Sequence, residues 1–130
     1  MQGPPFAGVV EGERFGPVGF TVSPAANQRY WASAGARHPL LAAGALYPPI
    51  AANLTILAFQ TIAPVPLLHA RQRLRAHRSG PAGVELTVTG AVSERYERRD
   101  REYVVVIAEI TLFDGDPLWT SVATFCEPGA

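Results

Sequence analysis

The stretch Tyr47-Pro-Pro-Ile-Ala-Ala-Asn-Leu-Thr-Ile-Leu-Ala-Phe-Gln-Thr-Ile62 decides the fold. It is apolar on almost every side, so as a helix it must be surrounded by protein rather than lie on a surface. Pro48 and Pro49 suit the entry to a helix, while Pro64 and Pro66 prevent its continuation. These features predict a buried helix of about four turns. It is too short to span a bilayer, which needs about 20 apolar residues.

Length and composition favour one globular domain over residues 1–130, because 48% of the residues are hydrophobic. The 11 basic and 11 acidic residues cancel, so no global field attracts nucleic acid or a membrane surface. A single cysteine, Cys126, rules out an internal disulfide. The N-terminal residues lack the charged start and apolar run of a signal peptide, so we expect a cytoplasmic protein.

The pattern changes to period two after the apolar stretch, which predicts strands joined by turns. The most β-branched run, Tyr103–Phe113, is expected to be central. Gly90 is expected to mark a bulge or the close approach of another backbone. Upstream, Ser23-Pro24 suits a helix start, and a helix over Pro24–Ala34 would align Ala26, Tyr30 and Ala34 beside Trp31. The predicted strands are Gly19–Val22, Leu67–His77, Val84–Tyr96, Tyr103–Phe113 and Leu118–Phe125.

The predicted element order is a strand, a helix, a loop, a buried helix and four antiparallel strands. This order predicts an α+β hot-dog fold, in which a sheet wraps around a central helix. An open sheet of this kind leaves an edge strand exposed. Because subunit pairing hides such an edge, we expect a dimer.

Three stretches carry a resemblance to the MaoC-like branch of the hot-dog superfamily, which includes the dehydratase region of bacterial fatty-acid synthases. The first is Tyr30-Trp-Ala-Ser-Ala-Gly-Ala-Arg-His-Pro-Leu40, similar to the family's Gly-Asp-x-Asn-Pro-x-His loop. The second is Pro49-Ile-Ala-Ala-Asn-Leu54, similar to Pro-Ile-Ala-His-Gly-Met. The third runs from Leu68 through Tyr96–Tyr103 to Phe113-Asp-Gly115. Together they cover nearly the whole chain.

The resemblance implies hydration or dehydration of a 3-hydroxyacyl thioester, for which the family uses an Asp and a His from that loop. Here the aligned Asp position is Ala36, the Asn position is His38 and the final His position is Leu41. The usual acid–base pair is therefore absent. At the helix entry, the family's His-Gly becomes Ala52-Asn53, although backbone N–H groups at a helix start can still face a thioester oxygen.

Five side chains are candidates for the chemistry, each with a simpler alternative. The imidazole of His38 can serve both proton transfers, or it is an ordinary loop residue. Tyr47 is a candidate donor to a bound carbonyl or a packing residue. Asn53 meets the ligand or caps its helix. Tyr30 and Trp31 line an apolar tunnel or pack the first helix.

A basic face is predicted on the strand Leu67–His77, where His69, Arg71, Arg73, Arg75 and His77 alternate with less polar residues. It could meet a phosphopantetheine, a carrier protein or nucleic acid. A solvated outer face partly neutralised by Glu85 or Glu94 is the simpler interpretation. The His spacings do not suit a metal site, and no cofactor is predicted, since no Gly-rich dinucleotide fingerprint is present.

The leading hypothesis is a lyase of the MaoC-like dehydratase or hydratase type, acting on a β-hydroxyacyl or polyketide-type substrate carried as an acyl-CoA, on an acyl carrier protein or free. A second hypothesis is a non-catalytic hot-dog subunit that binds acyl chains or stabilises an active partner. A third is polyketide tailoring by ketoreduction or cyclisation. The expected assembly is a homodimer or a heterodimer with another hot-dog chain, without nucleic-acid or membrane partners.

Overall fold

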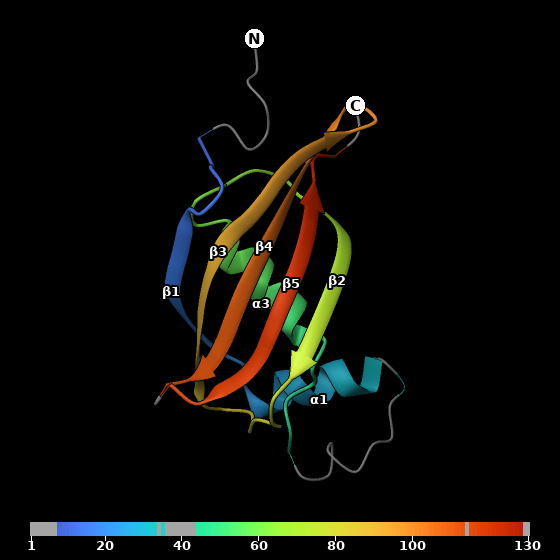
Figure 1. The fold of residues 1–130 in the computed structure, drawn as a ribbon. Helices are drawn as coiled ribbons and strands as arrows, with labels where there is room; N and C mark the ends of the chain where they lie inside the picture. Colours follow the sequence, from blue (N-terminus) through green and yellow to red (C-terminus); the bar gives the residue numbers. More distant parts are fainter. Residues whose placement is uncertain (1–7, 34, 36–43, 114, 129–130) are drawn as a thin grey trace.

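The chain folds as one five-stranded antiparallel sheet with α3 lying against one face and α1 at one end (Figure 1). This computed structural model describes residues 8–33, 35, 44–113 and 115–128. The strand order is β1-β3-β4-β5-β2, so the β-branched strand β4 is central as predicted. The hot-dog prediction is confirmed. In chain order the elements are β1 (Arg14–Thr21), α1 (Pro24–Ser33), α3 (Ile50–Phe59), β2 (Leu68–Ala76), β3 (Glu85–Arg98), β4 (Arg101–Leu112) and β5 (Pro117–Cys126).

The central helix α3 is shorter and more exposed than the sequence predicts. It has 10 residues, which is under three turns, because residues 60–63 form single turns instead of continuing the helix. Only one side meets the sheet, and Leu57 is 51% exposed on the other. The prediction of a helix enclosed on all sides was therefore wrong. Its buried residues are Ile50, Ala51, Leu54, Thr55, Ala58 and Phe59.

Helix α1 begins as predicted, because the Ser23 hydroxyl accepts a hydrogen bond of 3.1 Å from the Ala26 N–H. Its buried side chains are Asn27 and Trp31, one helical turn apart. Tyr30 is 40% exposed, so the predicted stripe through Ala26 and Tyr30 is not the buried one. Asn27 can be buried because its amide is hydrogen-bonded to the chain just before α3.

Strand β1 begins at Arg14 and not at Gly19, because its first residues pair with β3 around Phe15. Phe15 is buried directly over Gly90, where an added Cβ would overlap its ring. Gly90 therefore allows the approach of a side chain and not of another backbone. The irregularity in the β3–β4 pairing lies between Val92 and Glu94 instead.

Strand β2 is an edge strand and contains a register shift between His69 and Arg71 in its pairing with β5. The shift turns His69 to the helix side of the sheet, where its ring lies 5.3 Å from that of buried Phe125. Arg71 and Thr124 line a cavity on the outer face. The prediction that His69 shares a face with Arg71 was wrong, since strict alternation ignores the extra residue of a bulge.

The remaining strands follow the predicted pattern closely. Leu86, Val88 and Val92 of β3 are buried, whereas Val84 precedes the strand and is only half-buried. At the end of β5, buried Cys126 pairs with Tyr103 on β4 and Leu68 on β2. Within the ranges described above, no helix is long and apolar enough to cross a membrane.

Candidate functional site

The candidate site lies where the chain enters α3, and α1 holds this entry in place. The Asn27 amide donates to the Ala45 carbonyl at 2.9 Å and accepts from the Tyr47 N–H at 2.8 Å. The Trp31 indole N–H donates to the same Ala45 carbonyl at 2.9 Å. Two buried side chains of one helix thus fix the three residues that lead to Pro48. The role of Asn27 was missed because a lone asparagine in a helix gives no such signal in the sequence.

The structure brings three of the predicted site residues together as an aromatic cluster. The rings of Trp31 and Tyr47 lie 4.9 Å apart, and those of Tyr30 and Tyr47 lie 6.4 Å apart. Trp31 is buried and its indole N–H is hydrogen-bonded to Ala45. Among the residues described, Trp31 therefore packs α1 and positions the chain that leads to α3. Tyr47 is half-buried. Tyr30 borders a hollow of about 350 Å³ that it shares with Ala26, Arg29 and Ser33, a mixed polar and apolar surface.

The N–H groups at the start of α3 already have acceptors. Ile50, Ala51 and Ala52 donate to the carbonyls of Tyr47, Pro48 and Pro49 at 3.0, 3.0 and 3.2 Å. A thioester oxygen would have to replace one of these bonds, and that of Ala52 is the longest. Beside it the Asn53 side chain is exposed and has no hydrogen-bond partner among the residues described. This amide is therefore available to a ligand.

His38, Ala36 and Leu41 lie outside the described residues. The chain leaves α1 at Gly35, whose N–H donates to Ala32, and is described again from Gly44. Ala45, the next residue, is the one held by Asn27 and Trp31. The segment that contains His38 therefore connects α1 to the entry of α3.

A hydrogen-bonded chain that the sequence did not predict connects His69 to α3. Gln72 Oε1 lies 2.8 Å from His69 Nε2, and Gln72 Nε2 donates to Ser121 Oγ at 2.8 Å. Thr55 Oγ1 lies 2.8 Å from Ser121 Oγ and donates to the Ala51 carbonyl at 2.7 Å. Since a carbonyl only accepts and a hydroxyl has one proton, every bond points from His69 toward the helix. In this arrangement His69 Nε2 is the donor to Gln72 Oε1.

No group of three or more His, Cys, Asp and Glu side chains that could hold a metal ion occurs in the described part of the chain. Nothing in these residues therefore suggests a metal centre.

Comparison with known proteins gives fold relatives only. No protein-family model and no curated protein sequence matches the chain. Among solved structures, it is similar to the HadBC (3R-hydroxyacyl-ACP dehydratase) complex from Mycobacterium tuberculosis, with a TM-score of 0.76 and 19% identity over 91% of this chain and 97% of that one.

Two further structures show the same arrangement. R-hydratase PhaJ1 from Pseudomonas aeruginosa matches with a TM-score of 0.76 and 20% identity over 97% of this chain and 86% of that one. The MaoC-like dehydratase from Rhodospirillum rubrum matches with a TM-score of 0.69 and 21% identity over 93% and 96%. The resemblance inferred from sequence motifs is confirmed at the level of the fold.

Proposed function

We propose that this chain is a hydratase or dehydratase of β-hydroxyacyl thioesters or related polyketide-type compounds, with its site at the entry of α3. The observation that supports this most is the fold itself, which matches three hydratase or dehydratase structures over at least 91% of the chain. The proposed site combines the apolar residues of α3, which pack against the antiparallel sheet, with the polar groups at the helix start. An acyl-CoA or acyl carrier protein would deliver the substrate.

The reaction requires a base for the α-proton, an acid for the hydroxyl group and donors for the carbonyl oxygen. His38 is the titratable residue of the connecting segment and is assigned both proton transfers. Tyr47 is assigned a hydrogen bond to the substrate carbonyl. Asn53 and the Ala52 N–H are assigned to substrate binding. The Asn53 amide has no hydrogen-bond partner among the described residues, and the hydrogen bond of the Ala52 N–H is the longest at the start of α3.

Hydration of crotonyl-CoA, followed by loss of enoyl absorbance, tests the proposal. His38→Ala should lower kcat by about 100-fold, which is the usual contribution of a general acid–base residue. His77→Ala is the matched control, because His77 lies beyond the end of β2 and bonds Thr120. Equal turnover in the wild type and His38→Ala would remove His38 from the mechanism. Absence of activity with several acyl thioesters would favour the second candidate.

The second candidate is a non-catalytic hot-dog subunit that supports an active partner. It is favoured by Ala36 and Leu41, which cannot transfer protons, and by the occupied N–H groups at the start of α3. Edge strand β2 also leaves backbone groups available for pairing with another chain. Co-purification with a hot-dog protein that carries the intact Asp and His would support this function, whereas a homodimer active by itself would exclude it.

A further inference from the structure

A cavity of about 340 Å³ opens on the outer face of the sheet, away from α3, beneath the β3–β4 hairpin. Figure 1 shows that this hairpin and α1 lie at opposite ends of the sheet, so the cavity is separate from the entry of α3. Its polar lining comes from three arginines and three hydroxyl groups, those of Arg71, Arg98, Arg99, Tyr96, Tyr103 and Thr124.

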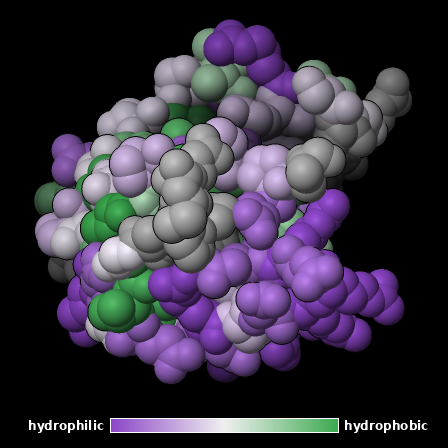
Figure 2. Space-filling model, turned by 90° about the horizontal axis from the view of Figure 1, so that it is seen from above, coloured by the Kyte–Doolittle hydropathy of each residue, from purple (hydrophilic) through white to green (hydrophobic). Residues whose placement is uncertain are grey.

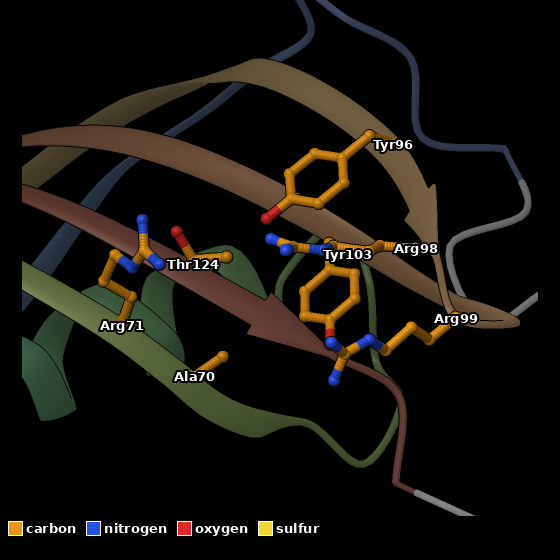
Figure 3. A pocket seen from close by; sticks show the side chains of 7 residues that line it. All are labelled: Ala70, Arg71, Tyr96, Arg98, Arg99, Tyr103 and Thr124. Atoms are coloured by element: carbon orange, nitrogen blue, oxygen red, sulfur yellow. The ribbon is translucent and has the colours of Figure 1, made fainter.

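The strand geometry explains why these side chains converge. Tyr96 and Tyr103 are direct cross-strand partners, and their rings stack 5.0 Å apart at 6°. Arg98 follows Tyr96 by two residues and therefore points to the same face. The bulge in β2 directs Arg71 outward from the opposite side. Figure 3 shows Arg71 on one side of the cavity and the arginines of the hairpin on the other.

Arg99 occupies a position in the hairpin turn that is unusual for arginine. Arg99 and Asp100 have φ values of 53° and 60°, the conformation of a two-residue type I′ turn. Gly, Asn and Asp are favoured at the first of these positions, because positive φ strains most other side chains. In Figure 3 the Arg99 side chain nevertheless extends to the cavity, which indicates a role for the guanidinium and not for the turn.

The three guanidinium groups have no carboxylate partner in the described part of the chain. The ion pairs there are Arg95–Glu102 and Arg78–Asp116, and neither belongs to the cavity. Glu97 and Glu102 are cross-strand partners that alternate with the tyrosines and so face the other side of the sheet.

An adjoining hollow extends this positive surface. It shares Arg71 with the cavity and adds Arg73, with Glu94 as its carboxylate. Viewed from the hairpin end, hydrophilic side chains gather toward the lower right of the molecule (Figure 2). Of the two carboxylates expected to neutralise this face, Glu94 lines the hollow, whereas Glu85 pairs with Thr21 at the opposite end of β3. The cavity and the hollow together contain four arginines and one carboxylate, that of Glu94. An excess of clustered positive charge destabilises a fold, so this arrangement favours an anionic ligand.

We propose that the cavity binds the phosphate groups of a small organic phosphate, either a phosphomonoester or a diphosphate. Guanidinium groups bind phosphate oxygens through two parallel hydrogen bonds, and each of the three hydroxyls supplies a further donor. The volume lies within the range of small-molecule sites, about 300–1,000 Å³. This inference does not depend on the proposed hydratase function, since the two sites lie at opposite ends of the sheet.

Calorimetric titration with inorganic pyrophosphate, and separately with ADP, tests the proposal. Arg98→Gln and Arg71→Gln should each weaken pyrophosphate binding about tenfold, the usual effect of losing a charged hydrogen bond. Arg75→Gln is the matched control, because Arg75 lies on β2 but not in the cavity, and it should leave binding unchanged. Tyr96→Phe keeps the ring stack and should weaken binding by a smaller factor. Tighter binding of ADP than of pyrophosphate would identify a nucleotide as the source of the phosphate.

Three results would overturn the proposal: no binding of either probe at millimolar concentration, equal affinity in Arg98→Gln and wild type, or equal competition by sulfate. Sedimentation analysis of the same variants covers a remaining interpretation. If Arg98→Gln changes the oligomeric state of the ligand-free protein, the surface is a contact between copies of the chain and not a phosphate site.

Discussion

Ser121 on β5 lies 2.8 Å from Thr55 on α3, and both side chains are completely buried. The two hydroxyls form a polar link between the sheet and the apolar helix. Because Gln72 also donates to Ser121, the link continues to the edge strand. Removal of the Thr55 hydroxyl leaves the Ser121 proton without an acceptor in the core, and removal of the Ser121 hydroxyl leaves Thr55 Oγ1 and Gln72 Nε2 without this partner.

Thr55→Val should therefore lower the free energy of unfolding by about 1–3 kcal/mol, the cost of an unsatisfied buried group. Ser121→Ala should have a similar effect. The double variant should lose less than the sum, because neither hydroxyl then remains unpaired. Urea denaturation measures all three. Thr87→Val on the outer side of β3 is the control, expected to change stability by under about 0.5 kcal/mol. Strict additivity would contradict the hydrogen bond.

The contact between Phe15 and Gly90 predicts a steric effect. An added methyl in Gly90→Ala overlaps the ring of buried Phe15, so the free energy of unfolding should fall by about 1–3 kcal/mol. Phe15→Leu combined with Gly90→Ala should recover part of this loss, although Phe15→Leu alone destabilises. The matched control is Gly19→Ala, whose methyl meets only the end of the flexible Glu85 side chain. Equal stability of the two glycine variants would refute the packing argument.

The ion pair Arg95–Glu102 should contribute more to stability than Arg78–Asp116. Both pairs have a distance of 2.7 Å, but the first pair's side chains are 24% and 26% exposed and the second pair's are 50% and 52% exposed. Arg95 also donates to the Val9 carbonyl. Arg95→Met should cost about 1.5–3 kcal/mol, whereas Arg78→Met should cost at most about 1 kcal/mol. Thermal and urea unfolding compare them, and a larger effect at Arg78 would contradict this ranking.

Asn27 should control the position of Tyr47. Asn27→Leu removes the donor to Ala45 and the acceptor of the Tyr47 N–H, which should cost about 1–3 kcal/mol of stability. If the site is as proposed, the variant should also lower kcat for crotonyl-CoA hydration at a temperature at which it is still folded. Gln28→Leu, a change of the adjacent exposed residue, is the control for both measurements.

The sequence predicted the number and order of the elements because period-two alternation and proline positions are local signals. Central β4 and the Ser23 cap at α1 followed from such signals. The orientation of His69 did not, because a bulge inserts a residue without altering the composition of the strand. The exposed side of α3 was not predicted either, because apolar residues alone do not show how far a sheet wraps around a helix.

The candidate site was predictable only in part. The predicted aromatic residues Tyr30, Trp31 and Tyr47 do lie together, because α1 packs against the chain that enters α3. Thr55 and Ser121 were not identified, since two small polar residues 66 positions apart within apolar runs give no pairing signal. Of the cavity arginines, the predicted basic face included only Arg71 on β2. Arg98 and Arg99 at the hairpin tip line the same cavity because β3 pairs with β4 and β4 pairs with β5.

Cys126 gives the protein a built-in chemical reporter. Cys126 is 4% exposed and is the last residue of β5, directly paired with Leu68 at the first residue of β2. A thiol reagent can reach this sulfur only when that corner opens. The rate at which Cys126 is labelled under native conditions therefore measures how often β2 separates from β5, without any introduced probe.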